Sequence, residues 1–289
     1  MEERKDKEMA AKVISFINLK GGVAKTTTTV GTAFALAEHF HKKVLVIDLD
    51  PQTNATSMLI GEERWAELDE ENSTLYNLFL DAVDGSRDFS LRRSIQKNVG
   101  NIKDAPGVDL LPSGLKMIYL QDEIYDIQYN NRTFNDPYMV LDITIGPVMN
   151  DYDYILIDCP PNLGILSLNG IQISDGYVIP CIPDILSTYG ISQIQNRISI
   201  FAHNKKLKVK LLGIVFTKTK KTAALHTRIQ EDFRNRSDAP CFKTVFYENS
   251  RYAEAAEYME PLTFRQKWGG SDGVQPYYDF CQELMERVR

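Results

Sequence analysis

The chain has 289 residues, of which 43% are hydrophobic and 25% charged, and its formal net charge is −6 at pH 7. This composition is typical of one large α/β domain or two small ones, and no run approaches the roughly eighteen apolar residues of a membrane span. The N-terminal sequence MEERKDKEMAAK is charged and has no apolar stretch, so a signal peptide is not expected there. The four cysteines lie far apart, which indicates free thiols in a reducing cytoplasm.

Apolar runs that predict strands alternate along the chain with patterns that predict helices. The strands are expected at 12–18, 43–48, 154–158, 176–181, 209–216 and 242–246. The helices are expected at 26–40, 164–173, 187–203, 222–236 and 276–288. This alternation is typical of βαβ units, so we predict an α/β fold with a doubly wound, mostly parallel sheet and helices on both faces.

The same pattern predicts the domain organisation. We expect a flexible N-terminal segment over 1–11 and a single domain over 12–289. Residues 60–150 mix acidic, amphipathic and basic pieces, and we predict that they form helical insertions on that domain. The segment before Lys12 is too short for a helix-turn-helix domain, so sequence-specific DNA reading is not expected.

A glycine-bearing stretch, Lys20 to Thr27, lies between the first predicted strand and the first predicted helix. Backbone N–H groups at a helix N-terminus converge on one point, and the helix dipole favours negative charge there. We therefore predict a phosphate-binding loop in which Lys25 lies along the β- and γ-phosphates and the Thr26 hydroxyl binds Mg²⁺. The nucleotide contacts are expected from Gly21, Gly22, Val23, Ala24, Lys25, Thr26 and Thr27. The alternative is a Gly-Gly turn between incidental lysines.

Two further strands end in acidic residues. The segment DLDPQTNA begins at Asp48 and contains Asp50, and the run YILID ends at Asp158. Open α/β sheets bind ligands at the carboxyl ends of their strands, where carboxylates are suited to holding Mg²⁺. Phosphoryl transfer requires an aligned nucleophile and little covalent chemistry, so one well-placed carboxylate is a sufficient catalytic group. The alternative is that Asp48 and Asp50 merely end a strand and cap the following turn.

Three segments resemble the ParA/MinD family of ATPases, which carry a deviant Walker A motif, and the likeness is closest to ParA. The loop has a second lysine, Lys20, before Gly-Gly and Lys-Thr-Thr. Residues 48–55 match the switch I segment D-x-D-P-Q-x-N-A, and residues 155–161, ILIDCPP, resemble Walker B and switch II. The loop departs from a strict Walker pattern at Ala24, where alanine costs about 1 kcal/mol relative to glycine if its φ is positive.

The resemblance implies an ATPase that uses ATP and Mg²⁺ and forms an ATP-dependent homodimer. Asp50 would orient or deprotonate the attacking water, and Asn54 would help to place it. Lys20 would reach the phosphates that are bound by the other subunit. The implied ligands of Mg²⁺ are Thr26, Asp48 and Asp158.

The family binds adenine at two later strand ends. The matching positions here are Thr217 on one side and the backbone of Pro183 and Asp184 on the other. Relatives commonly have asparagine where Phe216 or Thr217 stands, so this chain departs from the family pattern. The alternative is that these strand ends are loops without a ligand.

Basic residues are concentrated between Arg197 and Arg251, where thirteen Lys and Arg stand against four Asp and Glu. Such a concentration favours contact with phosphate backbones, and the family resemblance implies non-specific DNA binding by a cytoplasmic, nucleoid-associated protein with a ParB-like partner. The cargo would be a plasmid, a chromosome origin or a protein assembly. The candidate DNA contacts are Lys205, Lys206, Lys208, Lys210, Lys218, Lys220, Lys221, Arg228 and Arg251. The alternative is a set of solvated helix faces.

The C-terminal segment separates ParA-like from MinD-like members of the family. Its apolar stripe at helical spacing carries an excess of acidic residues, which is the wrong sign for anionic lipid, so we predict a helix that packs on the core. The stripe consists of Tyr277, Phe280, Cys281, Leu284, Met285 and Val288. Two alternatives stay open, a MinD-like regulator at the membrane and a protein that binds nucleotide without hydrolysing it.

Overall fold

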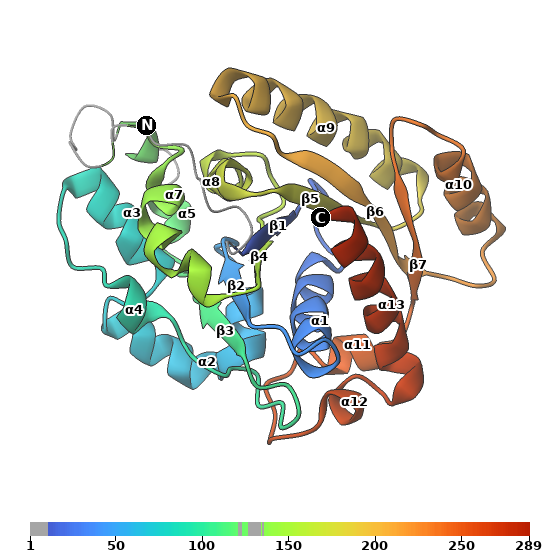
Figure 1. The fold of residues 1–289 in the computed structure, drawn as a ribbon, viewed down its shortest axis with the longest axis horizontal. Helices are drawn as coiled ribbons and strands as arrows, with labels where there is room; N and C mark the ends of the chain where they lie inside the picture. Colours follow the sequence, from blue (N-terminus) through green and yellow to red (C-terminus); the bar gives the residue numbers. More distant parts are fainter. Residues whose placement is uncertain (1–10, 121–122, 127–133, 135) are drawn as a thin grey trace.

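The computed structural model describes residues 11–120, 123–126, 134 and 136–289. Its centre is a seven-stranded sheet with the strand order β3-β2-β4-β1-β5-β6-β7 (Figure 1). Every pair of neighbouring strands in this sheet is parallel, which confirms the predicted fold class. The strands are β1 Lys12–Phe16, β2 Val44–Asp48, β3 Val108–Leu111, β4 Tyr154–Asp158, β5 Gly176–Cys181, β6 Lys210–Thr219 and β7 Cys241–Tyr247. The flexible segment expected at 1–11 lies outside the described residues except for Ala11.

The helices cover both faces of the sheet (Figure 1). They are α1 Lys25–Glu38, α2 Asn54–Glu70, α3 Leu75–Asp84, α4 Leu91–Ser94, α5 Met117–Leu120, α7 Val140–Ile145, α8 Ile165–Ile173, α9 Ile185–Lys205, α10 Ala224–Arg234, α11 Ser250–Glu254, α12 Phe264–Lys267 and α13 Ser271–Arg287. Two 3₁₀ turns, η1 Glu123–Asp126 and η2 Gly146–Asp151, complete the described elements. None of the helices in the described part of the chain combines the length and hydropathy that a membrane crossing requires.

The period-two pattern of the strands divides the core into two layers. In β1, Val13 belongs to the core layer that also contains residues of α3, α7, α8 and α9. Ile14 and Phe16 belong to the layer on the opposite face, with residues of α1, α12 and α13. Successive side chains of a strand point to opposite faces, so a strand that is apolar throughout is buried on both. The apolar runs read from the sequence therefore predicted the correct central strands.

The prediction of helical insertions over 60–150 is wrong for residues 108–111. These residues form β3, which pairs with β2 in the register Val44↔Val108 at the edge of the sheet. The run is short and contains an acidic residue, Asp109, so the sequence pattern did not predict a buried strand there. Asp109 accepts a hydrogen bond from Lys97 Nζ at 2.7 Å and another from the Tyr152 hydroxyl at 2.8 Å, so its charge is compensated by residues distant in sequence.

Helix α13 packs along α1, as the apolar stripe predicts. The ring of Tyr277 packs against α1 at Gly31, where an added Cβ would stand 2.2 Å from Tyr277 Cε1. The Tyr277 hydroxyl also donates to the carbonyl of Thr27 at 3.3 Å, in the first turn of α1. The helix begins at Ser271, five residues before the predicted start at Pro276. The C-terminal helix therefore supports the helix that follows the glycine-bearing loop.

Candidate nucleotide-binding site

Three strand ends bring the predicted motifs to one edge of the sheet. Strand β4 lies between β1 and β2, and Asp158 is in register with Phe16 on one side and with Asp48 on the other. The loop that follows Phe16 is the glycine-bearing stretch. The loop and both acids therefore lie at the carboxyl edge of the sheet, as expected for a ligand site of an open α/β fold.

The glycine-bearing loop has the backbone of a phosphate cradle. Gly22 has φ +74, and Ala24 has φ 61 and ψ 32, so alanine stands in the left-handed region at a cost of about 1 kcal/mol relative to glycine. Among the described residues, the backbone N–H groups from 21 to 27 donate no hydrogen bond. Seven consecutive donors beside the N-terminus of the 14-residue helix α1 suit an anion with several oxygens, such as a polyphosphate.

Two buried polar side chains hold this loop in place. The Asn18 amide donates to the carbonyl of Pro180 at 2.7 Å, and its oxygen accepts from the N–H of Lys20 at 2.9 Å. The Thr217 hydroxyl donates to the carbonyl of Val23 at 2.9 Å. The loop is therefore fastened to the ends of β5 and β6.

The predicted metal ligands lie together beneath the loop. The Thr26 hydroxyl donates to Asp158 Oδ2 at 2.6 Å, and Thr29 Oγ1 lies 3.4 Å from Asp158 Oδ1. Asp48 Oδ2 accepts from the N–H and from the hydroxyl of Thr56, at 2.8 and 2.7 Å. Asp48 and Asp158 are both fully buried. A hydroxyl and two carboxylates are hard oxygen donors, which fits Mg²⁺.

The charge states of these acids respond to their burial. Burial raises the pKa of Asp158 to about 6, against the lowering effects of the Thr26 hydrogen bond and of Lys25. Burial and the neighbouring Asp158 raise the pKa of Asp48 well above its ordinary range. A divalent cation would relieve this repulsion. No cluster of three His, Cys, Asp or Glu side chains that suits a metal occurs among the described residues, so phosphate and water would have to complete the coordination shell.

The switch I segment places its second acid toward the same site. Asp50 is 6% exposed, and burial raises the pKa of its carboxyl group. Its Oδ1 accepts from the N–H of Gln52 at 3.0 Å, and the Ser113 hydroxyl donates to its carbonyl at 2.7 Å. Asn54 is exposed and is the first residue of α2. Asp50 is thus held at a fixed position with little access to solvent.

The second lysine of the loop has a carboxylate partner in its own chain. Lys20 Nζ lies 2.8 Å from Asp184 Oδ2, and the two side chains are 40% and 28% exposed. Asp184 and Pro183 lie in the loop between β5 and α9. Asp184, a predicted adenine contact, therefore forms an ion pair with Lys20, the lysine predicted to reach the other subunit. Thr217, the other predicted adenine contact, is 1% exposed and bonded to the loop.

The predicted DNA contacts divide between two edges of the sheet. Lys205 ends α9 and forms an ion pair with Asp136, and Lys206, Lys208 and Lys210 follow it at the amino end of β6. The ten residues of β6 place Lys218 and its neighbours at the other end, about 30 Å away at roughly 3.3 Å per residue. The second group comprises Lys218, Lys220, Lys221, Arg228 and Arg251, from the carboxyl edge, α10 and α11.

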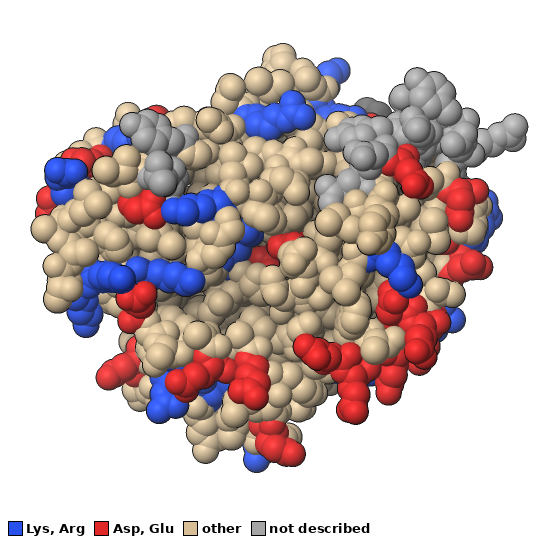
Figure 2. Space-filling view, turned by 180° about the vertical axis from the view of Figure 1, so that it is seen from behind, with Lys and Arg blue, Asp and Glu red and all other residues tan. Residues whose placement is uncertain are grey.

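Figure 2 shows basic side chains spread over the side that carries α10 and β7, and acidic side chains gathered over the side of α2.

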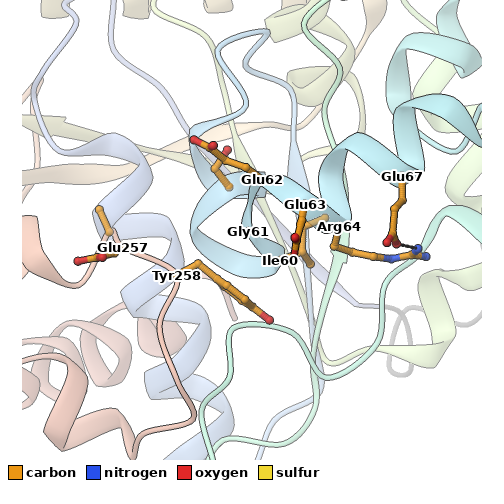
Figure 3. Close-up of a pocket in the computed structure, with 10 residues that line it drawn as sticks. Ile60, Gly61, Glu62, Glu63, Arg64, Glu67, Glu257 and Tyr258 are labelled. Atoms are coloured by element: carbon orange, nitrogen blue, oxygen red, sulfur yellow. Dashed lines mark hydrogen bonds and ion pairs between the residues drawn. The ribbon is translucent and has the colours of Figure 1, made fainter.

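A hollow of about 670 Å³ lies on the acidic side of the molecule, between the bend of α2 at Gly61 and the segment after α11 (Figure 3). It is lined by Ser57, Ile60, Gly61, Glu62, Glu63, Arg64, Glu67, Ala256, Glu257 and Tyr258. No predicted site residue lines it, and its excess of carboxylates disfavours a phosphate ligand.

Four polar residues of the site were not predicted from the sequence: Asn18, Thr29, Thr56 and Ser113. Each is buried, and each hydrogen-bonds to a motif residue or to the loop. Asn18 and Thr56 stand beside predicted motifs, so polar residues next to an apolar strand end were a usable signal. Ser113 follows β3, which was itself not predicted.

The parallel sheet, the phosphate cradle and the two acidic strand ends define a P-loop nucleotide-binding protein. A family model described as an AAA domain, AAA_31, matches residues 11–211. The chain is 28% identical to the sporulation initiation inhibitor protein Soj of Bacillus subtilis, covering 94% of this chain and 98% of Soj. It is also 28% identical to the chromosome partitioning protein ParA of Myxococcus xanthus, covering 96% and 88%. The chain belongs to this family of ParA- and Soj-like partition ATPases.

Solved structures share the fold. Cobyrinic acid a,c-diamide synthase from Mycobacterium smegmatis, determined with a bound ATP analogue and magnesium, superposes with a TM-score of 0.73 at 22% identity. The match covers 96% of this chain and 95% of the synthase. At that identity the likeness concerns the architecture alone.

Proposed function

We propose that this chain is an ATPase that dimerises around ATP and Mg²⁺, binds DNA without sequence preference, and positions a DNA or protein cargo together with a ParB-like partner. The observation that carries the proposal is the second lysine of the loop, Lys20, at the same edge as a complete phosphate cradle. A nucleotide site within one subunit needs only Lys25, so a second lysine in a partly exposed ion pair supports a role between subunits.

Hydrolysis is assigned to Asp50. The amide of Gln52 and the hydroxyl of Ser113 fix its position, and its raised pKa brings the carboxylate closer to the basicity needed to accept a proton from water. Thr26, Asp48 and Asp158 would hold Mg²⁺, which neutralises the charge that develops on the phosphates. Lys25 is 7% exposed, and its positive charge partly opposes the burial that raises the pKa of Asp50 and of Asp158. This supports a role for Lys25 beside the two carboxylates.

Dimerisation is assigned to Lys20. In the single subunit its ammonium group is held by Asp184, in an ion pair that is partly exposed and therefore weak. A triphosphate bound to a second subunit carries more negative charge than one carboxylate. Lys20 would therefore leave Asp184 and bind that triphosphate across the dimer interface. The γ-phosphate supplies contacts that the ADP state lacks, which makes the dimer dependent on ATP.

DNA binding is assigned to the basic residues at the carboxyl edge. Lys220 and Lys221 lie at the same edge as the nucleotide site, so a dimer formed there would bring two basic groups together. Phosphate contacts of this kind bind without sequence preference and weaken with salt. The proposed location is accordingly the cytoplasm, on the nucleoid.

The membrane-bound alternative has no support from the C-terminal helix. Tyr277, Phe280 and Leu284 are buried against α1 and the sheet, so α13 has no free apolar face to place in a lipid surface.

The experiment is an ATPase assay with wild type and Asp50→Ala. Loss of turnover, by at least about a hundred-fold, with ATP binding retained would support Asp50 as the catalytic acceptor. Unchanged turnover in Asp50→Ala contradicts the assignment. A wild-type protein that binds ATP without hydrolysing it, even with DNA present, would leave only a nucleotide-binding module.

A further inference from the structure

Strand β6 reaches the phosphate-binding loop through one side chain, Thr217. We propose that Thr217 is a positioning residue for phosphate binding: its hydroxyl holds the Val23 carbonyl so that the adjoining N–H of Ala24 is directed at the phosphates. This inference rests on the proposed nucleotide-binding function. It gives Thr217 a role different from the adenine contact that the family pattern implies.

The direction of the Ala24 N–H follows from peptide geometry. Carbonyl and N–H of one trans peptide lie in one plane and point in opposite directions, and no described peptide bond is cis. The Thr217 hydroxyl donates to the Val23 carbonyl at 2.9 Å, so that carbonyl points at β6. The N–H of Ala24 therefore points away from β6, and no described residue accepts a hydrogen bond from it.

This hydrogen bond also holds Ala24 in an unfavourable conformation. At φ 61 and ψ 32, Ala24 stands in the left-handed region, which glycine adopts more readily than alanine. Without the Thr217 hydroxyl, the peptide before Ala24 is free to rotate toward an ordinary φ, and its N–H would turn out of the cradle. Val23 is 1% exposed, so rotation or loss of the donor would also leave a buried carbonyl without a partner.

Burial separates this role from contact with a base. Thr217 is 1% exposed, and its neighbour Phe216 is fully buried. The single hydroxyl proton of Thr217 is already donated to the loop. A nucleotide approaching from solvent would therefore meet the loop that Thr217 supports and not the side chain itself.

The test compares Thr217→Val with Thr217→Ser. Valine has the shape of threonine without the hydroxyl, and we expect it to weaken ATP binding by about five- to thirty-fold, because a buried carbonyl loses its donor. Serine keeps the hydroxyl and should bind ATP within about two-fold of wild type. The preference for ATP over GTP should be the same in all three proteins, since the base is not touched. Titration with fluorescent ATP, competed by ATP or GTP, measures both quantities.

Thr219→Val is the matched control. Thr219 lies two residues further along β6, is 3% exposed, and its hydroxyl has no hydrogen-bond partner among the described residues. Its replacement should leave ATP affinity unchanged. If Thr217→Val proves insoluble, Thr217→Ala removes the same hydroxyl without adding a methyl group.

Two results would overturn the inference. One is wild-type affinity for ATP in the variant that lacks the hydroxyl. The other is a loss of the preference for ATP over GTP, which would assign Thr217 to the base. A wild-type protein that fails to bind ATP would instead refute the proposed function, so the two failures are distinguishable.

Discussion

Asp48 and Asp158 link the stability of the protein to pH at the scale of single residues. Burial raises the pKa of Asp158 to about 6 and that of Asp48 well above its ordinary range. In the unfolded chain, both groups titrate at about 3.9. Above pH 4 the folded protein therefore keeps protons that the unfolded chain has lost. The stability of the nucleotide-free protein should fall as pH rises from about 4 to about 6 through the titration of Asp158.

Magnesium should reverse this trend, because carboxylates must lose their protons to bind a cation. We predict that Mg²⁺ added to the ATP complex raises Tm more at pH 7 than at pH 5, measured by thermal unfolding. ATP with EDTA at each pH is the control for the nucleotide alone. Asp158→Asn should remove the magnesium-dependent part of the shift and raise the Tm of the nucleotide-free protein at pH 7. An equal magnesium effect at both pH values contradicts this account.

The ion pair between Lys20 and Asp184 predicts a second residue-scale effect. The dimer requires Lys20 to leave Asp184, so Asp184→Asn should favour the ATP-bound dimer. The pair is partly exposed, which limits the gain in dimer affinity to about five-fold or less. Sedimentation of the variant in an Asp50→Ala background, which prevents turnover, measures the dissociation constant.

Asp238→Asn is the matched control for this measurement. Asp238 pairs with Arg236 at 2.7 Å in the loop before β7, away from the nucleotide edge, and its loss should not change dimer affinity. Weaker dimerisation in Asp184→Asn would show that the carboxylate serves the dimer and does not restrain Lys20.

At the scale of elements, the contact between α1 and α13 predicts an asymmetry between two helical glycines. Gly31→Ala places a methyl group 2.2 Å from Tyr277 Cε1, so we expect it to lower the free energy of unfolding by about 1–3 kcal/mol despite the better helix propensity of alanine. Gly190→Ala in α9 meets nothing within 4 Å and should be neutral or stabilising by up to about 1 kcal/mol. Urea unfolding measures both. Equal effects at the two sites would refute the packing argument.

The elements also show what the sequence was able to predict. Strands β1, β2 and β4 are mostly apolar and end in an acid or before a glycine-bearing loop, so the sequence predicted both their burial and the edge of the sheet that binds the ligand. Strand β3 was not predicted, because Asp109 interrupts the apolar run, and its side-chain partners Lys97 and Tyr152 lie 12 and 43 residues away in the sequence. Asn18 stands beside the loop and was a usable signal, but its bond to the Pro180 carbonyl is a tertiary contact. Thr217 was expected at the base, because its bond to the Val23 carbonyl joins residues that are far apart in the sequence.

At the scale of the whole molecule, the two ends of β6 should differ in their effect on DNA binding. Lys221 and Arg251 lie on the side of the nucleotide edge, whereas Lys206 and Lys208 lie at the amino end of β6. We predict that Lys221→Ala with Arg251→Ala weakens ATP-dependent DNA binding and reduces its salt slope by about 1–2.

The matched pair Lys206→Ala with Lys208→Ala removes the same charge and should have the smaller effect. Fluorescence anisotropy with a random-sequence duplex over a range of salt concentrations measures both pairs. A larger loss from the pair at the amino end would place the DNA on the other edge, and equal binding with ADP would remove the link to the nucleotide.

The central claim is that one triphosphate joins two copies of this chain through Lys20. The most direct measurement is the mass of Asp50→Ala with ATP and Mg²⁺, by size-exclusion chromatography with light scattering, beside Lys20→Ala/Asp50→Ala. We predict twice the subunit mass of 32.9 kDa for the first protein and a single subunit for the second, with ATP still bound. A dimer that persists without Lys20, or a monomer in both samples, would contradict the account.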